Sequence, residues 1–272
     1  SCRWRVFRCR LFRTEGPTWW PVCGRWGWCN PYMHAAYGHK KMINAPKIYK
    51  MRIVLRGPEK GSGHTNVFNA IRNMVLASGL AFEPAKINKN WPRLAYGPAP
   101  AFGQRAEREY ADIYLTQPVP VRQVQEALEK ALPAGMELIS VERVPYALAS
   151  VQNLAAAARY RVEGNFALYG PEKTPEEFFN APRIEIVRRA ENGLTMTENI
   201  KPYVAGGQTL SPRAIRLTMQ SVEGKWIKPQ TAVAAWLGLD VPLQDELFTV
   251  EGFTFIREGL FWQDTQGELH LI

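Results

Sequence analysis

The order of periodic segments between residues 51 and 141 limits the fold of this chain more than any other feature. Alternating apolar residues predict a strand over Met51–Arg56, and apolar residues at spacings of three and four predict a helix from about Thr65 to Gly79. A strand from Tyr110 to Leu115 follows, with Ile113 and Leu115 expected on the packed face and Tyr110, Asp112 and Tyr114 on an accessible one. Two prolines then introduce a second helix, which leads to a strand over Met136–Val141. This helix carries an apolar stripe of Val121, Val124, Leu128 and Leu132. The order of elements in this region is therefore strand, helix, strand, strand, helix, strand.

The second half of the chain repeats this order with an additional hairpin. Its predicted elements are strands over 158–162, 183–189, 194–198, 213–220 and 247–257, and helices over 174–180 and 229–237. Thr174 and Pro175 suit the N-cap and the first position of the helix over 174–180. The split βαβ arrangement that this order typifies has its helices on one face of a four-stranded sheet. The sequence thus predicts an α+β protein of two tandem ferredoxin-like (βαββαβ) units with antiparallel sheets, over residues 51–153 and 154–272, the second with a peripheral tail from Trp262.

Residues 1–50 differ in composition from the rest of the chain. They hold ten Lys or Arg against one acid, whereas the remainder holds 24 basic and 24 acidic residues, so the net charge of +9 belongs to this segment. Five of the nine tryptophans also lie here, without helical or strand periodicity. We interpret residues 1–50 as a non-native or disordered segment, such as a mis-assigned start or the remnant of an upstream fusion. The alternative is a basic, aromatic arm that binds RNA.

All four cysteines lie in the same segment. A zinc site built from Cys2, Cys9, Cys23 and Cys29 is the metal hypothesis, but these spacings lack the two tight Cys-x2-Cys knuckles that structural zinc sites use. The following 222 residues contain no cysteine, so no disulfide supports their fold. No apolar run approaches 18 residues. We therefore expect a cytoplasmic protein with no membrane contact and no cofactor.

Candidate functional side chains gather in the stretch from Trp91 to Leu115 and at the start of the first predicted helix. A histidine at a helix N-terminus has a lowered pKa, so His64 is a candidate general base with Asp112 or Glu109, or else a capping residue beside Asn66. Arg93 and Tyr96 could bind phosphate or stack on a base, or Arg93 could pair with Glu107 or Glu109. The full set of candidate binding residues is His64, Asn66, Arg93, Tyr96, Glu107, Glu109, Tyr110 and Asp112.

Several short motifs resemble a known family. They are Gly63-His64-Thr65-Asn66, Ala77-Ser78-Gly79-Leu80, Pro92-Arg93-Leu94, Tyr96-Gly97-Pro98, the turn with Glu107, Glu109, Tyr110 and Asp112, and Asn199-Ile200-Lys201-Pro202. Met51 to Phe261 is similar in order and length to the radical SAM-linked family, a domain encoded beside or fused to cobalamin-binding radical SAM proteins. Residues 87–92 depart from the run Gly-Phe-Asn/His-Pro-Arg-Pro of that family and keep only its last proline.

The resemblance implies a partner rather than a radical SAM enzyme. A radical SAM cluster needs three cysteines close together, and residues 51–272 have none. We expect a non-catalytic partner or substrate-binding module that serves a radical SAM protein in RNA or ribosome-related modification. The alternative is a stand-alone RNA-binding protein, or a metal-independent RNA-cleaving enzyme that uses His64. The balanced charge after residue 50 favours the first hypothesis, because nucleic-acid binders normally carry a basic surplus.

Overall fold

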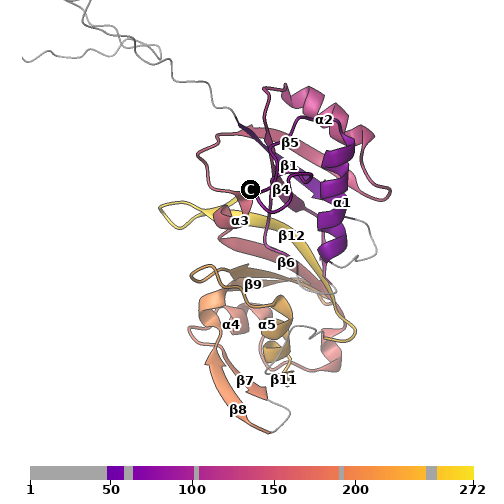
Figure 1. Ribbon diagram of the computed structural model, residues 1–272. Helices are drawn as coiled ribbons and strands as arrows, with labels where there is room; N and C mark the ends of the chain where they lie inside the picture. Colours follow the sequence, from indigo (N-terminus) through magenta and orange to yellow (C-terminus); the bar gives the residue numbers. More distant parts are fainter. Residues whose placement is uncertain (1–47, 58–63, 101–103, 190–192, 243–249) are drawn as a thin grey trace, which may run out of the picture. The chain divides into compact units, whose positions relative to one another are not determined.

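The computed structural model describes residues 48–57, 64–100, 104–189, 193–242 and 250–272, and the side chains of residues 64–66 are outside this description. The part of the chain from Pro46 to Ile272 forms one compact unit. It is a mixed α+β protein with few helices and mainly antiparallel sheets (Figure 1). Below, the first half means residues 48–153 and the second half residues 154–272.

The first half contains a four-stranded antiparallel sheet with the order β2-β4-β1-β5. Its elements are β1 (Tyr49–Arg56), α1 (His64–Ala77), β2 (Leu94–Tyr96), β4 (Glu109–Leu115), α2 (Val121–Lys130) and β5 (Glu137–Val144). The first strand begins two residues before the predicted Met51, because Tyr49 and Lys50 already pair with Leu115 and Tyr114. Every described strand of this sheet therefore pairs with a neighbour far away in the sequence.

Helices α1 and α2 pack on the same face of this sheet (Figure 1). The predicted apolar stripe of α2 is confirmed, since Val124 and Leu128 are fully buried. Alternate residues of β1 and β4 point to the helices, as the two-residue period of a strand requires. The resulting core contains Met51, Ile53, Leu55, Val67, Ile71, Met74, Val75, Ala111, Ile113, Leu115, Val124, Leu128 and Val141.

The opposite face of this sheet is buried as well. All seven residues of β4 are buried, so the prediction that Tyr110, Asp112 and Tyr114 lie on an accessible face is wrong. Val54 and Tyr110 belong to the core of the second half instead. The sheet is therefore covered on both sides, and the polar groups on its second face need internal partners.

The second half contains a larger sheet with the order β13-β12-β6-β10-β9. Its strands are β6 (Ala157–Glu163), β9 (Val204–Ser211), β10 (Ala214–Gln220), β12 (Thr254–Gln263) and β13 (Leu269–Leu271), and the short β3 (Arg105–Ala106) of the first half pairs with β12 in parallel. Its helices are α3 (Val151–Leu154), which ends the first half, α4 (Pro175–Phe179) and α5 (Pro229–Trp236), with 3-10 turns η2 (Phe166–Leu168) and η3 (Lys201–Tyr203).

The start of α4 was predicted from sequence and is confirmed. Thr174 is the N-cap and Pro175 the first helical residue, and Thr174 and Glu177 form a reciprocal capping box. Phe179 at the end of this short helix is fully buried beside β9. Trp236 of α5 packs near Phe179 in the same core, with 5.8 Å between the ring centroids. Both helices thus contribute to one core with the sheet.

Two elements of the second half differ from the sequence prediction. β9 was not predicted, because its glycines and polar residues give no strand signal. Its Gly207 is required by packing, since a Cβ there would lie 2.4 Å from the ring of Phe179. The strand predicted over 247–257 lies instead at Thr254–Gln263, and the C-terminal segment returns to it as β13.

The hairpin expected around Gly193 forms a separate small sheet. β7 (Glu185–Arg189) and β8 (Thr195–Asn199) are antiparallel, and β11 (Val241–Pro242) joins β7 in parallel. Of the predicted turn Glu191-Asn192-Gly193, the first two residues lie outside the described residues. Among the described residues, no helix is long and apolar enough to cross a membrane.

Candidate functional site

A buried ion pair joins the two halves. Arg257 of β12 donates from Nη2 to Glu109 Oε2 of β4 at 2.7 Å, and the two side chains are 1% and 8% exposed. Arg257 also donates to the carbonyl of Pro98, and its own carbonyl accepts from the Glu107 amide at 2.9 Å. A charge in this position needs such partners, because an unpaired buried ion is strongly destabilising.

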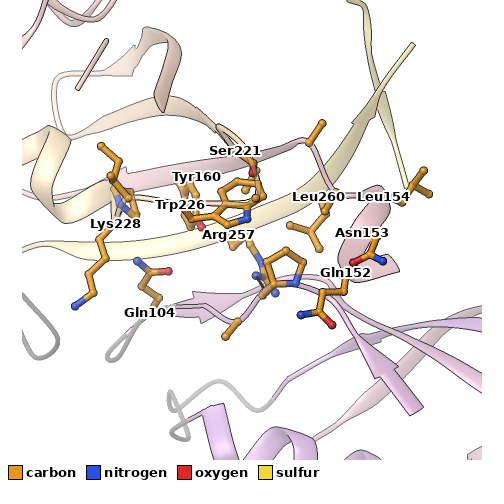
Figure 2. Close-up of a pocket in the computed structure, with 18 of the residues that line it drawn as sticks. Gln104, Gln152, Asn153, Leu154, Tyr160, Ser221, Trp226, Lys228, Arg257 and Leu260 are labelled. Carbon is orange, nitrogen blue, oxygen red and sulfur yellow. Dashed lines mark hydrogen bonds between the residues drawn. The ribbon is translucent and has the colours of Figure 1, made fainter. Parts of the chain in front are cut away.

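A cleft with a volume of about 690 Å³ lies directly against this ion pair. Its described lining comes from both halves and consists of Pro98, Ala99, Gln104, Gln152–Ala156, Ala158, Tyr160, Ser221, Glu223, Gly224, Trp226–Pro229, Arg257 and Leu260. Figure 2 shows Trp226, Tyr160 and Arg257 grouped at its centre, with Gln104 and Lys228 towards one end and Gln152 and Asn153 towards the other. The volume of the cleft and its mixture of apolar and polar lining residues are typical of sites that bind small molecules.

The floor of the cleft means the buried side chains of Arg257 and Tyr160, which line it, together with Glu109, the partner of Arg257. Burial raises the pKa of the Glu109 carboxyl, and the adjacent Arg257 only partly opposes this effect. Burial also raises the pKa of the fully enclosed Tyr160 hydroxyl, again against the influence of Arg257. The Nε atom of Arg257 is buried without a hydrogen-bond acceptor among the described residues. The floor therefore keeps one unsatisfied donor in a region of low polarity.

Trp226 forms one wall. It lies in the connection between β10 and α5, where Val222 and Lys225 pair across a tight turn with positive φ at Glu223 and Gly224. The ring is partly buried against the core of the second half. None of the ring–ring or cation–π contacts among the described residues involves Trp226, although Trp236 makes tilted contacts with two phenylalanine rings and Trp262 stacks on His270.

A second wall is held in place by Asp112. Its side chain is fully buried and receives Arg52 Nε at 2.8 Å and the backbone amide of Val151 at 2.9 Å. Val151 begins α3, so the carboxylate fixes the helix that brings Gln152 and Asn153 to the cleft. The side chains of Gln152 and Asn153 are exposed and make no hydrogen bond among the described residues. Asp112 thus positions the cleft without lining it.

The remaining predicted site residues lie away from the cleft. Arg93 pairs with Glu83 at 2.7 Å, rather than with Glu107 or Glu109, and its guanidinium lies 4.1 Å from the ring centre of Tyr114. Tyr96 stacks on Phe68 and donates to its carbonyl, and burial raises its pKa.

Glu107 and Tyr110 also have internal partners. Glu107 pairs with Arg161 at 2.7 Å, and Tyr110 is a core residue whose hydroxyl accepts from the Leu260 amide at 3.5 Å. The predicted set therefore does not form one surface: Glu109 borders the cleft and Asp112 supports it, whereas Arg93, Tyr96 and Glu107 make separate contacts.

The two predicted residues of the first helix, and the cysteines, cannot be added to this site. His64 and Asn66 lie in the first turn of α1, but their side chains are outside the described residues. The two acids proposed to assist His64 are both engaged, Asp112 by Arg52 and Glu109 by Arg257. Cys2, Cys9, Cys23 and Cys29 lie outside the described part of the chain.

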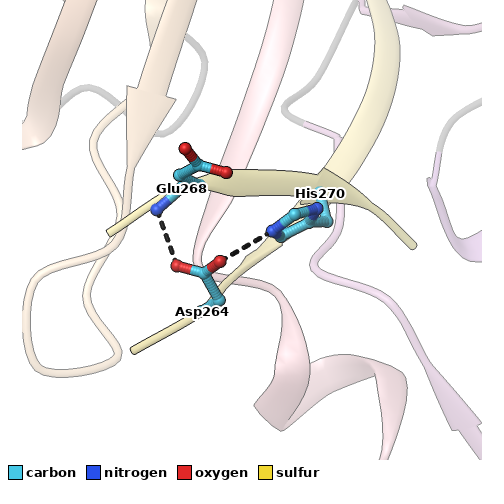
Figure 3. Close-up of side chains that lie close together, drawn as sticks. All are labelled: Asp264, Glu268 and His270. Atoms are coloured by element: carbon cyan, nitrogen blue, oxygen red, sulfur yellow. Dashed lines mark hydrogen bonds and ion pairs between the residues drawn. The ribbon is translucent and has the colours of Figure 1, made fainter. Parts of the chain in front are cut away.

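A cluster of potential metal ligands occurs at the C-terminal hairpin. Asp264, Glu268 and His270 each offer one ligand atom within 4.8 Å of the others (Figure 3). The Asp264 carboxylate already accepts from the Gln266 and Glu268 amides and lies 2.9 Å from His270 Nε2, and hydrogen bonds from His270 and the Glu268 amide lower its pKa. These contacts close the turn between β12 and β13, and they account for the cluster without an ion.

Sequence reasoning did not identify Arg257, Tyr160 or Trp226. A usable signal was present for Arg257, because it and Glu258 are adjacent charges within the largely apolar run Phe253–Phe261, and a charge on the buried face of a strand must find an internal partner. Trp226 stands in Gly224-Lys225-Trp226-Ile227-Lys228, a turn that combines a tryptophan with two lysines. Their convergence with Glu109 joins positions that lie 51 (Tyr160), 117 (Trp226) and 148 (Arg257) residues away in the sequence, which local patterns do not report.

Comparison with known proteins identifies the family of the chain. No curated protein matches it. A family model described as "Uncharacterized protein conserved in bacteria (DUF2344)" matches residues 88–229, just over half of the chain. The matched region includes Glu109, Asp112 and Trp226 and ends before Arg257. The chain therefore belongs to the DUF2344 family.

Proposed function

We propose that this protein is a non-catalytic substrate-binding module that serves a radical SAM enzyme in RNA or ribosome-related modification. The observation that carries the proposal is the cleft of about 690 Å³, which is lined by residues from both halves, among them Arg257, the buried partner of Glu109. The choice of a radical SAM partner rests on the sequence resemblance to the radical SAM-linked family.

The lining of the cleft supports binding rather than catalysis. Its described residues include no histidine or cysteine, so they provide neither a Ser–His nor a Cys–His pair. Arg257 is held by Glu109 and Pro98, which suits a rigid recognition surface. The chemistry of the modification would then belong to the partner.

The proposal includes a fold assignment and a location. Each half is a ferredoxin-like unit in this proposal, supported by the strand orders β2-β4-β1-β5 and β12-β6-β10-β9, in which the first and third strands are central neighbours. The small sheet of β7, β8 and β11 is then an insertion in the second unit. A cytoplasmic location is supported by the absence of cysteine from residue 51 to the end.

Direct binding to the partner tests this function. The purified full chain and each radical SAM protein of the source organism would be titrated against one another by biolayer interferometry. We expect one of them to bind, and Ala156→Phe, which fills the cleft, to keep this complex while blocking modification of the partner's substrate. Failure of every radical SAM protein to bind, or turnover by the isolated chain, would contradict the proposal.

A further inference from the structure

The side chains that line the cleft indicate which class of ligand it binds. This inference rests on the proposed function, in which the cleft is the binding site. We infer that it binds an uncharged nucleobase, stacked on Trp226 and contacted at its edge by the side-chain amides of α3. The three observations that lead to this inference concern the tryptophan, the amides and the balance of charge.

The first observation is the unstacked ring of Trp226. Trp236 packs against Phe166 and Phe179 and donates from Nε1 to the Lys173 carbonyl at 2.8 Å. Trp226, in contrast, is only partly buried, lines the cleft, and makes no ring-stacking or cation–π contact with another described residue. A flat heterocycle can stack on this ring, because every nucleobase has an aromatic face that stacks favourably on an aromatic side chain.

The second observation is the group of side-chain amides on α3. Gln152 and Asn153 each offer a donor and an acceptor, and neither is used within the described part of the chain. Asp112 fixes the start of α3 through the Val151 amide, so these amides are presented from a supported helix rather than from a loose loop. A nucleobase edge carries the alternating donors and acceptors that two such amides can match.

The third observation is the balance of charge around the cleft. Arg257 is neutralised by Glu109, and Lys228 and Glu223 contribute opposite charges to the lining. A site for phosphate would present a surplus of positive charge, usually with arginine available for bidentate contact. The cleft therefore recognises the base and not the phosphate. The base can belong to a free nucleoside or to a single-stranded RNA.

The test uses the full chain with three kinds of ligand. The four ribonucleosides, their 5′-monophosphates and an eight-nucleotide single-stranded RNA would be titrated calorimetrically at 50 and 200 mM salt. We expect nucleoside binding that changes by less than about twofold between these salt concentrations, since no phosphate contact releases counterions. Trp226→Ala should weaken it roughly 5- to 150-fold, the loss of one stacked base, whereas Trp226→Phe keeps most of the affinity.

Matched variants show whether a loss of nucleoside binding comes from the cleft or from a general effect on the protein. Trp262→Ala removes a tryptophan that stacks on His270 outside the cleft, and it should leave the affinity unchanged. Gln152→Ala/Asn153→Ala alters two exposed side chains without threatening the fold, and it should also weaken binding. This double variant keeps the test valid if Trp226→Ala fails to fold.

The outcomes are distinct. Binding of RNA but not of nucleosides, weakened by Trp226→Ala and nearly independent of salt, supports the inference with the base presented by RNA. Absence of any binding, equal binding by wild type and the cleft variants, or a steep dependence on salt overturns it. If neither nucleosides nor RNA bind while a radical SAM protein still binds the chain, only the ligand class is wrong and the proposed function stands.

Discussion

The carboxylate of Asp112 accepts a hydrogen bond from the backbone amide of Val151 at 2.9 Å, which connects a central strand of the first sheet to the first residue of α3. The same carboxylate pairs with the buried Arg52. One side chain thus satisfies a buried cation and an unpaired helix-terminal amide at once.

Replacement of Asp112 by alanine should therefore be strongly destabilising. It leaves Arg52 buried and unpaired and the Val151 amide without an acceptor, so we expect a loss of about 3–5 kcal/mol in the free energy of unfolding. Urea denaturation measures this loss. Glu126→Ala is the control, because it removes an exposed pair with Arg122 and should cost less than about 0.5 kcal/mol. A similar, small loss in both variants would contradict the assignment.

The buried pair of Glu109 and Arg257 predicts a dependence of stability on pH. Burial raises the pKa of Glu109, so the folded state favours the protonated carboxyl more than the unfolded state does. The contribution of Glu109 to stability is then complete below the unfolded pKa of about 4.3 and is lost as the pH rises through the folded pKa. Relative to Glu109→Gln, the wild type should lose stability in this window, by at most about 1.4 kcal/mol per pH unit. Urea titrations from acid to neutral pH give the free energy of unfolding of both proteins at each pH. If the two plots of this free energy against pH are parallel, the pKa of Glu109 is not raised.

Gly164 should not tolerate a side chain. A Cβ at this position would lie 2.2 Å from Cδ1 of Phe253, whose ring also packs against Phe166. We expect Gly164→Ala to lower the free energy of unfolding by about 1–3 kcal/mol, as overpacking does. Gly57 offers the matched control, because a Cβ there meets nothing within 4 Å and its backbone is not left-handed. Chemical denaturation that finds Gly57→Ala as damaging as Gly164→Ala would show that the effect is not one of packing.

The elements that local periodicity determines could be predicted from the sequence. The apolar stripe of α2, with Val124 and Leu128, and the N-cap Thr174 of α4 depend on residues within two turns of one another, and both predictions are confirmed. The strand β9 could not be predicted in this way, since Gly207 is selected by the ring of Phe179 and not by strand propensity. Pairing with β10 and packing against α4 stabilise this strand.

The candidate site was less accessible to sequence reasoning than the fold. Asp112 was placed on the accessible face of a predicted strand and Glu109 in the charged turn before it, but the strand begins at Glu109 and is buried on both faces. Their actual roles depend on Arg257, 148 residues away in the sequence, and on Val151, 39 residues away. Since the partner of a buried charge is chosen by tertiary packing, only the three-dimensional structure could show that the cleft lies beside this pair.

The position of a bound base relative to Trp226 tests the account most directly. In a ¹⁵N–¹H correlation spectrum of the full chain, the indole resonance missing from Trp226→Phe identifies Trp226. Addition of the tightest-binding nucleoside should shift this resonance progressively and leave that of Trp262 in place, because Trp262 lies outside the cleft and stacks on His270. A Trp226 resonance that stays unchanged at saturating nucleoside, or one that moves no more than that of Trp262, would contradict a base-binding cleft.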